Sequence, residues 1–506
     1  MNPSGIDRKR WGTWAAFAAL FAIYWLSVPR NHSEAEDAYR YAKVVESGSF
    51  GEMTDPNRLL ALPAFGAAYR AARACGYAGR AFPFMIAINR LSAVVALGLF
   101  FGVARRLVRD ERKVWAATLS VAFCYGFWRY AGEAEVYLPA LALALAAWWV
   151  ALRGRWALAG AFGGLGVLFH LLNAWPLLGV LPLLFFVRRE PKRAVGYGLV
   201  AGGVALLGYA TVFSALNWGR LGTHDHALEA GFSATNGLRG LLAFGQNVVS
   251  GNFLFGFSGF RETLARLFPS RMLAEEFFMG DRMPGWIAPL GLATLAATAL
   301  AGVAAIGAFD AERTDRRAWA LAPLWLVGYA AAVVHVEAGS PELWLMALVP
   351  LWLTLLPFLR RRVAFALVGA LFAHNLAAGL LPLRSEAADY HAAKCAWAIA
   401  HAGPEDVVLV DYEPVLISYL QYRCPARVVD SGSADCAEIR SVLGSSAGKA
   451  YALASFFEPA ESMRVREPRQ YARMRATGDA FRPDFEKVAE NEFGGVYVLK
   501  KRGRDE

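Results

Sequence analysis

The most regular feature of this 506-residue chain is the recurrence of long apolar stretches between short polar segments. A helix needs about 20 apolar residues to cross the hydrocarbon core of a bilayer, and eleven stretches approach or exceed that length. They cover residues 11–28, 83–104, 114–128, 136–151, 156–171, 174–187, 194–216, 285–309, 318–335, 342–359 and 363–383. The pattern predicts a mainly α, polytopic transmembrane helical bundle. At Asn173 and Pro176, one kinked or re-entrant element is the alternative to two spans.

The pattern changes after residue 383, where short alternating segments replace the long apolar stretches. One helix-like segment, 414–422, lies among strand-like segments at 406–411, 427–430, 451–457 and 495–499. This arrangement predicts a small α/β domain over residues 384–506, following a transmembrane domain over residues 1–383. Within the latter, two long loops at 29–82 and 217–284 suit amphipathic helices at a membrane surface.

Composition supports the same division. The chain is 56% hydrophobic and 19% charged, with a mean hydropathy of +0.33, whereas a soluble protein carries about 25% charged residues. Residues 384–506 hold 36 charged side chains with a net charge of −2, and residues 1–383 hold 58 with a net charge of +12. A soluble protein of ordinary composition is therefore excluded for the first part of the chain.

The charges of the loops predict the orientation of the spans. With the N-terminus inside, the cytoplasmic segments carry 20 basic residues, and the three short outward loops carry one, Arg129. Short cytoplasmic loops of membrane proteins are enriched in Lys and Arg in this way. Eleven spans then place the C-terminal domain outside the cytoplasm, whereas an even number would reverse its location. Because the net charge of +10 reflects orientation, no nucleic-acid partner is expected.

Acidic residues at the outer membrane edge are few, and they form two groups. Glu36 and Asp37 follow the first span, while Glu133 and Glu135 lie in or beside the short loop near 129–135. Charges at a membrane edge are costly and mark functional sites by default. One carboxylate of such a set can accept a proton while another positions the reactant or holds a metal. The plainer interpretation is that these acids begin solvated helices.

Three more polar residues lie at or within the predicted spans. Arg90 is about seven residues into the second span, roughly 10 Å from its outer end, and Arg129 lies in the short loop near 129–135. Both are candidates for a function because charges in or beside a span are costly, and His170 ends the fifth span on the outer side. Snorkelling or ion pairing of the arginines and a structural role for the histidine are the alternatives. Weaker candidates are His224 and His226 in the second long loop, and Glu337 and Glu342 before the tenth span.

Glycine and cysteine patterns indicate structure more than chemistry. The pairs Gly160-xxx-Gly164 and Gly198-xxx-Gly202 predict close helix packing. Cys395, Cys424 and Cys436 fall in the outward tail, where oxidation is permitted. A disulfide between Cys424 and Cys436 is the pairing considered there.

The segment Glu36-Asp37-Ala38-Tyr39-Arg40-Tyr41-Ala42 resembles the acidic motif of GT-C glycosyltransferases. These polytopic enzymes take a sugar from a polyprenyl-phosphate carrier on the outer face, and they include protein mannosyltransferases and lipid A aminoarabinose transferases. The resemblance spans roughly residues 10–190 and continues through residues 89–92, 127–130, 133–137 and 166–170. This chain has Glu-Asp where the family often has Asp-Asp or Asp-Glu, so the identity of the catalytic acid stays open.

The resemblance implies a glycosyltransferase that moves a sugar from a polyprenyl-phosphate donor to an acceptor hydroxyl with inversion. The implied location is a bacterial inner membrane, with the active site and the C-terminal domain on the periplasmic side. The acceptor is a lipid, a glycan or a protein. The implied catalytic carboxylates are Asp37, Glu36, Glu133 and Glu135, and the implied donor-phosphate ligands are Arg90, Arg129 and His170. Dependence on a divalent metal stays open, with Asp37, Glu135 and His170 as candidate ligands.

Two other classes of function fit the same sequence. A transporter or lipid flippase also carries charges within its spans, but transporters usually show repeated halves and helices broken at midplane, which this sequence does not display. A non-catalytic membrane scaffold whose tail binds a partner is the second alternative, and in it the outer carboxylates would have no chemical role.

Overall fold

The computed structural model describes residues 3–33, 35, 37–216, 233–267 and 273–500. Contacts divide the chain into two compact units. The first comprises Met1–Pro29, Val44–Phe253 and Trp286–Arg384, and the second comprises Arg30–Lys43, Leu254–Gly285 and Ser385–Glu506. The second unit therefore combines the C-terminal tail with part of each predicted outward loop.

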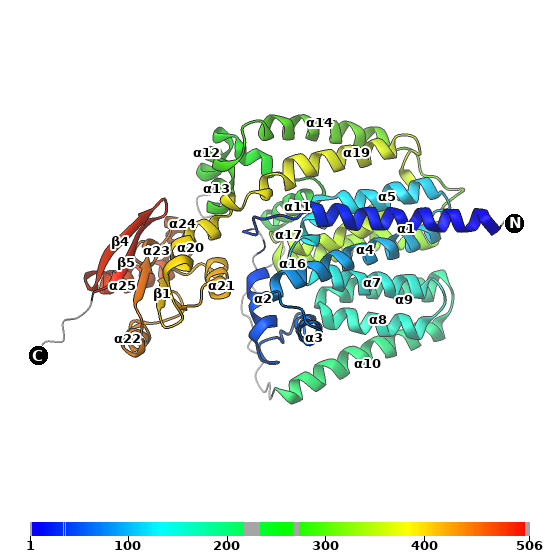
Figure 1. Cartoon of the computed structure of the whole chain (residues 1–506). Coiled ribbons are helices and arrows are strands. Elements are labelled where there is room, and N and C mark those ends of the chain that lie inside the picture. Colours follow the sequence, from blue (N-terminus) through cyan, green and yellow to red (C-terminus); the bar gives the residue numbers. More distant parts are fainter. Residues whose placement is uncertain (1–2, 34, 36, 217–232, 268–272, 501–506) are drawn as a thin grey trace, which may run out of the picture. The chain divides into compact units, whose positions relative to one another are not determined.

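The first unit is an assembly of helices, many of which lie side by side in Figure 1. Each of the eleven apolar stretches is helical over most of its length. The helices are α1 (Pro3–Leu26), α3 (Ala61–Ala74), α4 (Ala81–Leu107), α5 (Glu111–Phe123), α6 (Tyr125–Ala131), α7 (Tyr137–Ala151), α8 (Trp156–Phe169), α9 (Ala174–Pro182), α10 (Pro191–Ala215), α11 (Ala234–Val248), α14 (Ile287–Ala305), α15 (Arg316–Trp319), α16 (Leu321–Glu337), α17 (Pro341–Trp344), α18 (Leu348–Leu355) and α19 (Ala364–His374). Helix α2 (Ala38–Ser47) crosses the boundary between the units.

Five helical segments are long and apolar enough to cross a membrane, and shorter apolar helices accompany them. The five are Ala81–Leu107, Pro191–Ala215, Ile287–Ala305, Arg316–Glu337 and Pro341–Phe358. The predicted mainly helical, membrane-type architecture is thus confirmed. The number of crossings and their direction stay predictions.

The chain breaks between α8 and α9. His170 is extended, with φ −159° and ψ 123°, and a 3₁₀ turn follows over Leu171–Asn173. Asn173 Nδ2 donates to the carbonyl oxygens of Gly166 on α8 and Ala140 on α7, at 2.9 Å each, which holds the turn against both helices. The extended residue and the 3₁₀ turn interrupt the helix, so residues 156–187 form separate helices and not one kinked helix.

Small residues allow α8 and α10 to approach closely. A Cβ atom added at Gly160 would lie 2.9 Å from the Tyr197 carbonyl oxygen, and one at Gly164 would lie 2.6 Å from that of Ala201. The packing prediction is therefore confirmed for this pair. For Gly198 and Gly202 it is wrong, because a Cβ at Gly198 would meet only Leu181 at 3.7 Å and one at Gly202 would meet nothing within 4 Å of the described residues. A spacing of four residues does not reveal which face of a helix meets a neighbour.

Asp110 joins three loops of the first unit, all predicted to be cytoplasmic. It caps α5 through the backbone amides of Arg112 and Lys113, and its Oδ2 accepts from Arg361 Nε at 2.8 Å and Arg313 Nη1 at 3.1 Å. Burial by itself raises the pKa of Asp110, but the hydrogen bonds from Arg361 and the two amides outweigh it and lower that pKa. The carboxylate therefore stays ionised and holds the loops together.

The second unit is built on a five-stranded sheet with the order β2-β1-β3-β5-β4. The strands are β1 (Val407–Val410), β2 (Arg427–Asp430), β3 (Ala450–Leu453), β4 (Phe485–Asn491) and β5 (Gly494–Leu499). Strand β1 is parallel to both β2 and β3, whereas β5 is antiparallel to β3 and to β4, with which it forms the red hairpin in Figure 1. All residues of β1 and β3 are buried, as expected for the central strands of a sheet covered on both faces.

Helices complete the second unit. They are α12 (Ser258–Leu267), α13 (Ala274–Arg282), α20 (Tyr390–His401), α21 (Pro414–Arg423), α22 (Cys436–Ser445), α23 (Ala454–Phe457), α24 (Glu461–Arg466) and α25 (Pro468–Phe481). The core includes Phe456, Phe457, Phe481 and Phe485 packed on β1 and β3 residues. The prediction of a strand over 451–457 is wrong after Leu453, where the chain continues as helix α23. Periodicity alone cannot distinguish a strand from a buried helix in so short an apolar run.

The disulfide considered for the tail does not form. All five cysteines are described, and each is free. Cys424 ends α21 with its sulfur 3.8 Å from the Ala398 carbonyl oxygen, whereas Cys436 begins α22 with its sulfur 3.8 Å from Thr477 Oγ1. The two thiols therefore have separate surroundings, with strand β2 between them in the chain.

The two glycine pairs provide a matched test of helix packing. Gly164→Leu must push α8 from α10, and overpacking of this kind costs about 1–3 kcal/mol. We expect a lower midpoint of thermal unfolding for Gly164→Leu in detergent, and an unchanged midpoint for Gly202→Leu. Equal destabilisation by both substitutions would contradict the packing described here.

Candidate functional site

A buried polar cluster lies in the first unit around the short connection between α6 and α7. Glu133 and Glu135 belong to this connection, and their residues are 0% and 4% exposed. Three other buried polar residues of the cluster are Asn89 and Arg90 on α4 and Arg129 on α6. Five polar residues buried in an otherwise apolar unit are costly, so each needs a partner or a function.

Asn89 fixes the backbone of the connection. Its amide nitrogen donates to the carbonyl oxygens of both Glu133 and Glu135, at 2.6 Å each. These two bonds satisfy carbonyl groups that no helix accommodates. Asn89 could be singled out from the sequence only as part of a motif, because nothing in a single sequence indicates that α4 meets this connection.

Arg129 and Glu133 form a buried ion pair. They are four residues apart at the end of α6, and their side chains are 3% and 0% exposed. Pairing offsets part of the desolvation cost that each charge would otherwise incur. Arg129 is thus committed to a carboxylate, and a donor phosphate would have to share it.

Arg90 has different surroundings. Its guanidinium lies over the Trp25 ring at 4.7 Å from the centroid, and the residue is 6% exposed. Its buried Nε has no hydrogen-bond partner among the residues that the structure describes. A buried guanidinium with an unused donor is suited to an anion that arrives from outside the protein.

An aromatic pair connects this cluster with His170. Tyr137 begins α7 directly after Val136, and its ring centroid is 5.1 Å from that of His170 and 6.4 Å from that of Tyr130. The Tyr130 hydroxyl donates to Glu342 Oε2 at 3.4 Å. His170 Nδ1 accepts from the Leu172 amide at 3.3 Å, which leaves Nε2 as the ring nitrogen for a ligand.

Glu337, one of the weaker candidates before the tenth predicted span, has an exposed side chain.

The acidic motif after α1 lies in the second unit. Asp37 precedes α2, its side chain is 33% exposed, and its Oδ1 is 2.8 Å from Arg40 Nη2. The Tyr41 hydroxyl donates to the same carboxylate. Asp37 is therefore reachable from solvent and held in one orientation, as a proton acceptor requires. Glu36 lies outside the described residues, as do His224 and His226.

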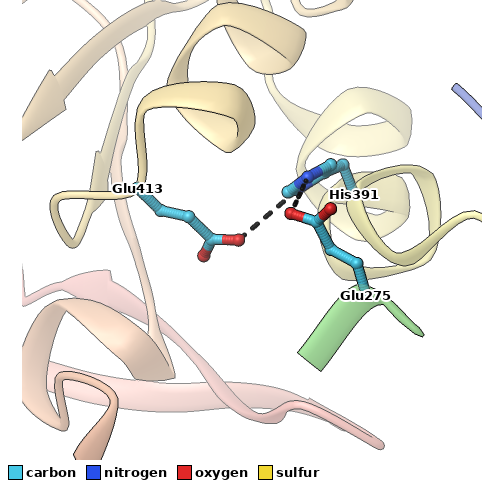
Figure 2. Close-up of side chains that lie close together, drawn as sticks. All are labelled: Glu275, His391 and Glu413. Atoms are coloured by element: carbon cyan, nitrogen blue, oxygen red, sulfur yellow. Dashed lines mark hydrogen bonds and ion pairs between the residues drawn. The ribbon is translucent and has the colours of Figure 1, made fainter. Parts of the chain in front are cut away.

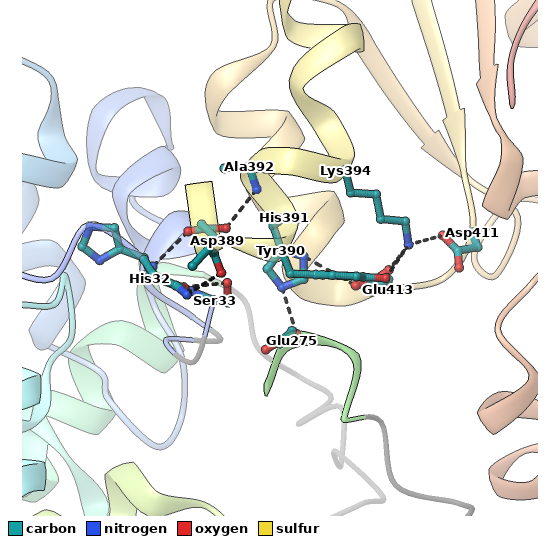
Figure 3. A network of polar contacts seen from close by, with 12 residues as sticks. His32, Ser33, Glu275, Asp389, Tyr390, His391, Ala392, Lys394, Asp411 and Glu413 are labelled. Atoms are coloured by element: carbon teal, nitrogen blue, oxygen red, sulfur yellow. Dashed lines mark hydrogen bonds and ion pairs between the residues drawn. The ribbon is translucent and has the colours of Figure 1, made fainter. Parts of the chain in front are cut away.

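The segment before Asp37 is anchored within its own unit. The backbone amide of His32 donates to Asp389 Oδ2 at 2.9 Å, and Asn31 Nδ2 donates to the Ala388 carbonyl oxygen at 2.8 Å. Figure 3 shows His32 beside Asp389, which also caps α20. These bonds attach the motif to the start of α20.

A second polar cluster, which sequence analysis missed, lies in the second unit. Its members are Glu275, His391, Lys394, Asp411 and Glu413 (Figure 3). Three of them, Glu275, His391 and Glu413, form the only group of metal-ligating side chains found among the described residues whose ligand atoms all lie within 4.8 Å of one another. Glu275 lies more than 100 positions before His391 and Glu413, so no spacing in the sequence could have indicated that the three residues meet.

Burial and charge shift the pKa values of this second cluster. Burial lowers the pKa of His391 and of Lys394, but the facing carboxylates outweigh burial and raise both. For Asp411, burial raises the pKa, whereas the pKa of Glu413 is lowered by Lys394 and His391 despite burial. The cluster thus depends on mutual compensation of its charges.

The sequence matches no family model and no curated protein. Among solved structures, ArnT from Cupriavidus metallidurans bound to undecaprenyl phosphate is similar over 97% of this chain and 98% of its own, at 13% identity and a TM-score of 0.56. ArnT in the apo state gives 14% identity and 0.48 over the same shares. The oligosaccharyltransferase AglB from Archaeoglobus fulgidus, with an inhibitory peptide and dolichol phosphate, gives 11% and 0.44 over 97% and 75%. This chain therefore has the fold of ArnT over 97% of its length, which confirms the resemblance to GT-C glycosyltransferases at the level of the fold.

Proposed function

We propose that this protein is a membrane glycosyltransferase that moves a sugar from a polyprenyl-phosphate donor to an acceptor hydroxyl on the extracytoplasmic face. The observation that carries the proposal is Arg90, a buried guanidinium in an apolar helix with an unused hydrogen-bond donor. The ArnT fold supports it, since ArnT was solved bound to undecaprenyl phosphate. Of the three functions considered from the sequence, transfer accounts for both this cation and the partly exposed Asp37.

The proposed reaction is a single displacement. The acceptor oxygen bonds to the anomeric carbon while the bond from that carbon to the phosphate oxygen breaks, so the configuration inverts. The electron pair leaves with polyprenyl phosphate, and the hydroxyl proton passes to the Asp37 carboxylate, with Glu36 as the alternative acceptor. The phosphate gains a second negative charge as it leaves, and a preorganised cation such as Arg90 stabilises that charge.

The remaining residues have supporting roles in this proposal. Glu133 pairs with Arg129 and keeps it in place, while Asn89 holds the connection that carries Glu135. Glu135 is the candidate second carboxylate. Asp37, Glu135 and His170 stay the candidate ligands of a divalent metal, and none of the proton and phosphate roles above is assigned to that metal.

Replacement of Asp37 tests the proposed base. We expect Asp37→Asn to lower the rate about 10²–10⁴-fold, the contribution of a general base, because the amide cannot accept the proton. The assay supplies undecaprenyl-phosphate mannose or aminoarabinose with a membrane extract and measures undecaprenyl phosphate release by mass spectrometry. Glu262→Gln on exposed α12 is the control. Full activity in both Asp37→Asn and Glu36→Gln would refute the assignment.

Arg90 can be tested by binding alone. Arg90→Gln should weaken binding of undecaprenyl phosphate about 30-fold or more, because removing one partner of a buried hydrogen-bonded charge pair costs about 2–5 kcal/mol and each 1.4 kcal/mol is tenfold. Native mass spectrometry in detergent measures this affinity. Arg106→Gln, at an exposed position near the end of the same helix, should bind as the unmodified protein does. Equal affinity in the two variants would exclude Arg90 as the phosphate ligand.

The sidedness of the proposal has its own test. Alkaline phosphatase is active only after export, so a fusion at the C-terminus should be active and a fusion after Arg189, in a predicted cytoplasmic loop, should be inactive. Measured phosphatase activity, corrected for expression, gives the answer. An inactive C-terminal fusion would overturn both the eleven-span topology and the outward location of the second unit.

A further inference from the structure

The group formed by Glu275, His391 and Glu413 lies apart from the residues proposed for transfer. Figure 2 shows the His391 ring between the two carboxylates. His391 Nε2 is 2.9 Å from Glu275 Oε1, and Nδ1 is 3.5 Å from Glu413 Oε1. All three residues belong to the second unit.

Secondary structure fixes each of the three side chains. His391 lies in the first turn of α20, which Asp389 caps by accepting from the Ala392 amide at 2.9 Å. Glu413 follows buried strand β1 and directly precedes α21. Glu275 lies in the first turn of α13, whose Phe278 packs on Tyr390 and on Phe493. A preorganised set of this kind loses little entropy when it binds a ligand.

The His391 ring has an unmet polar atom. The residue is fully buried, and its Nδ1 has no hydrogen-bond partner among the residues that the structure describes. A buried polar nitrogen without a partner costs free energy. An imidazole nitrogen facing carboxylate oxygens is the ligand set of zinc and related transition-metal ions.

Contacts within the cluster leave one carboxylate oxygen of Glu413 for the ion. Lys394 Nζ is 2.6 Å from Glu413 Oε2 and 3.9 Å from Asp411 Oδ1 (Figure 3). Glu413 Oε1 faces His391 and not the lysine. The lysine therefore pairs with one oxygen of Glu413 and leaves the other directed at the imidazole, where a metal ligand is needed.

We propose that the second unit binds one divalent transition-metal ion, with Zn²⁺ as the representative, through Glu275, one ring nitrogen of His391, and Glu413. Water completes a four-coordinate site. The ion attaches α13, from the loop between the seventh and eighth predicted spans, to α20 and α21 of the tail. This role is structural and independent of the proposed sugar transfer.

Metal content tests the proposal directly. Full-length protein in detergent is stripped with a chelator, dialysed against ZnCl₂, and analysed by plasma mass spectrometry and by competition with a fluorescent chelator. We expect one saturable equivalent, and binding weakened at least about 100-fold by His391→Ala, since even indirect ligand contacts contribute 10–100-fold to affinity. His401→Ala is the matched control, because His401 is exposed on the same helix.

Further variants guard against misfolding and against another site. Glu275→Gln keeps the size of a side chain that is 28% exposed, so lost affinity in this variant supports coordination without a core defect. The double variant His224→Ala/His226→Ala should still bind one equivalent of Zn²⁺. Loss of Zn²⁺ in that double variant, or unchanged binding in His391→Ala, would overturn the site. Absence of saturable binding in the unmodified protein would also overturn the proposal.

Discussion

The first unit depends on how charge is accommodated inside an apolar helical assembly. Arg129 and Glu133 are almost wholly buried, and either one alone would cost several kcal/mol by desolvation. Their pairing, together with the two bonds from Asn89, allows an irregular connection to pass between α6 and α7 where backbone groups cannot use water. The proposed donor site is a consequence of that arrangement. Once the connection is fixed and Arg129 is paired with Glu133, Arg90 is the arginine of the cluster that forms no ion pair with the described residues.

Much of the architecture was predictable because apolar composition and helix length are local properties. All eleven apolar stretches are helical, and the tail contains the predicted β1, β2, β5 and α21. Other features depend on tertiary contacts. The face of α10 that meets α8 excludes Gly198 and Gly202, strand β3 is shorter than its apolar run, and Cys424 and Cys436 have separate surroundings. None of these follows from spacing, since each depends on which surface a neighbouring element covers.

The candidate site divides in the same way. Five site residues could be selected from the sequence because polar residues are rare among apolar ones, and all five are buried in one unit. They are Glu133, Glu135, Arg90, Arg129 and His170. Their partners could not be selected. The role of Asn89 requires the contact between α4 and the connection after α6, and the Glu275, His391 and Glu413 group combines a loop with two places in the tail. Asp37, chosen for its motif, is attached to α20 through neighbours that the motif does not contain.

The loops gathered at Asp110 have a consequence for biosynthesis. Asp110 receives Arg313 from 203 residues later in the chain and Arg361 from 251 residues later. A ribosome delivers these residues in order, so the carboxylate emerges long before either guanidinium exists. Until Arg361 arrives, the helices that flank Asp110 lack the contact that joins their loop to the later ones. Closure of this three-loop junction is therefore a late event of assembly, reached only when the penultimate predicted span has been inserted.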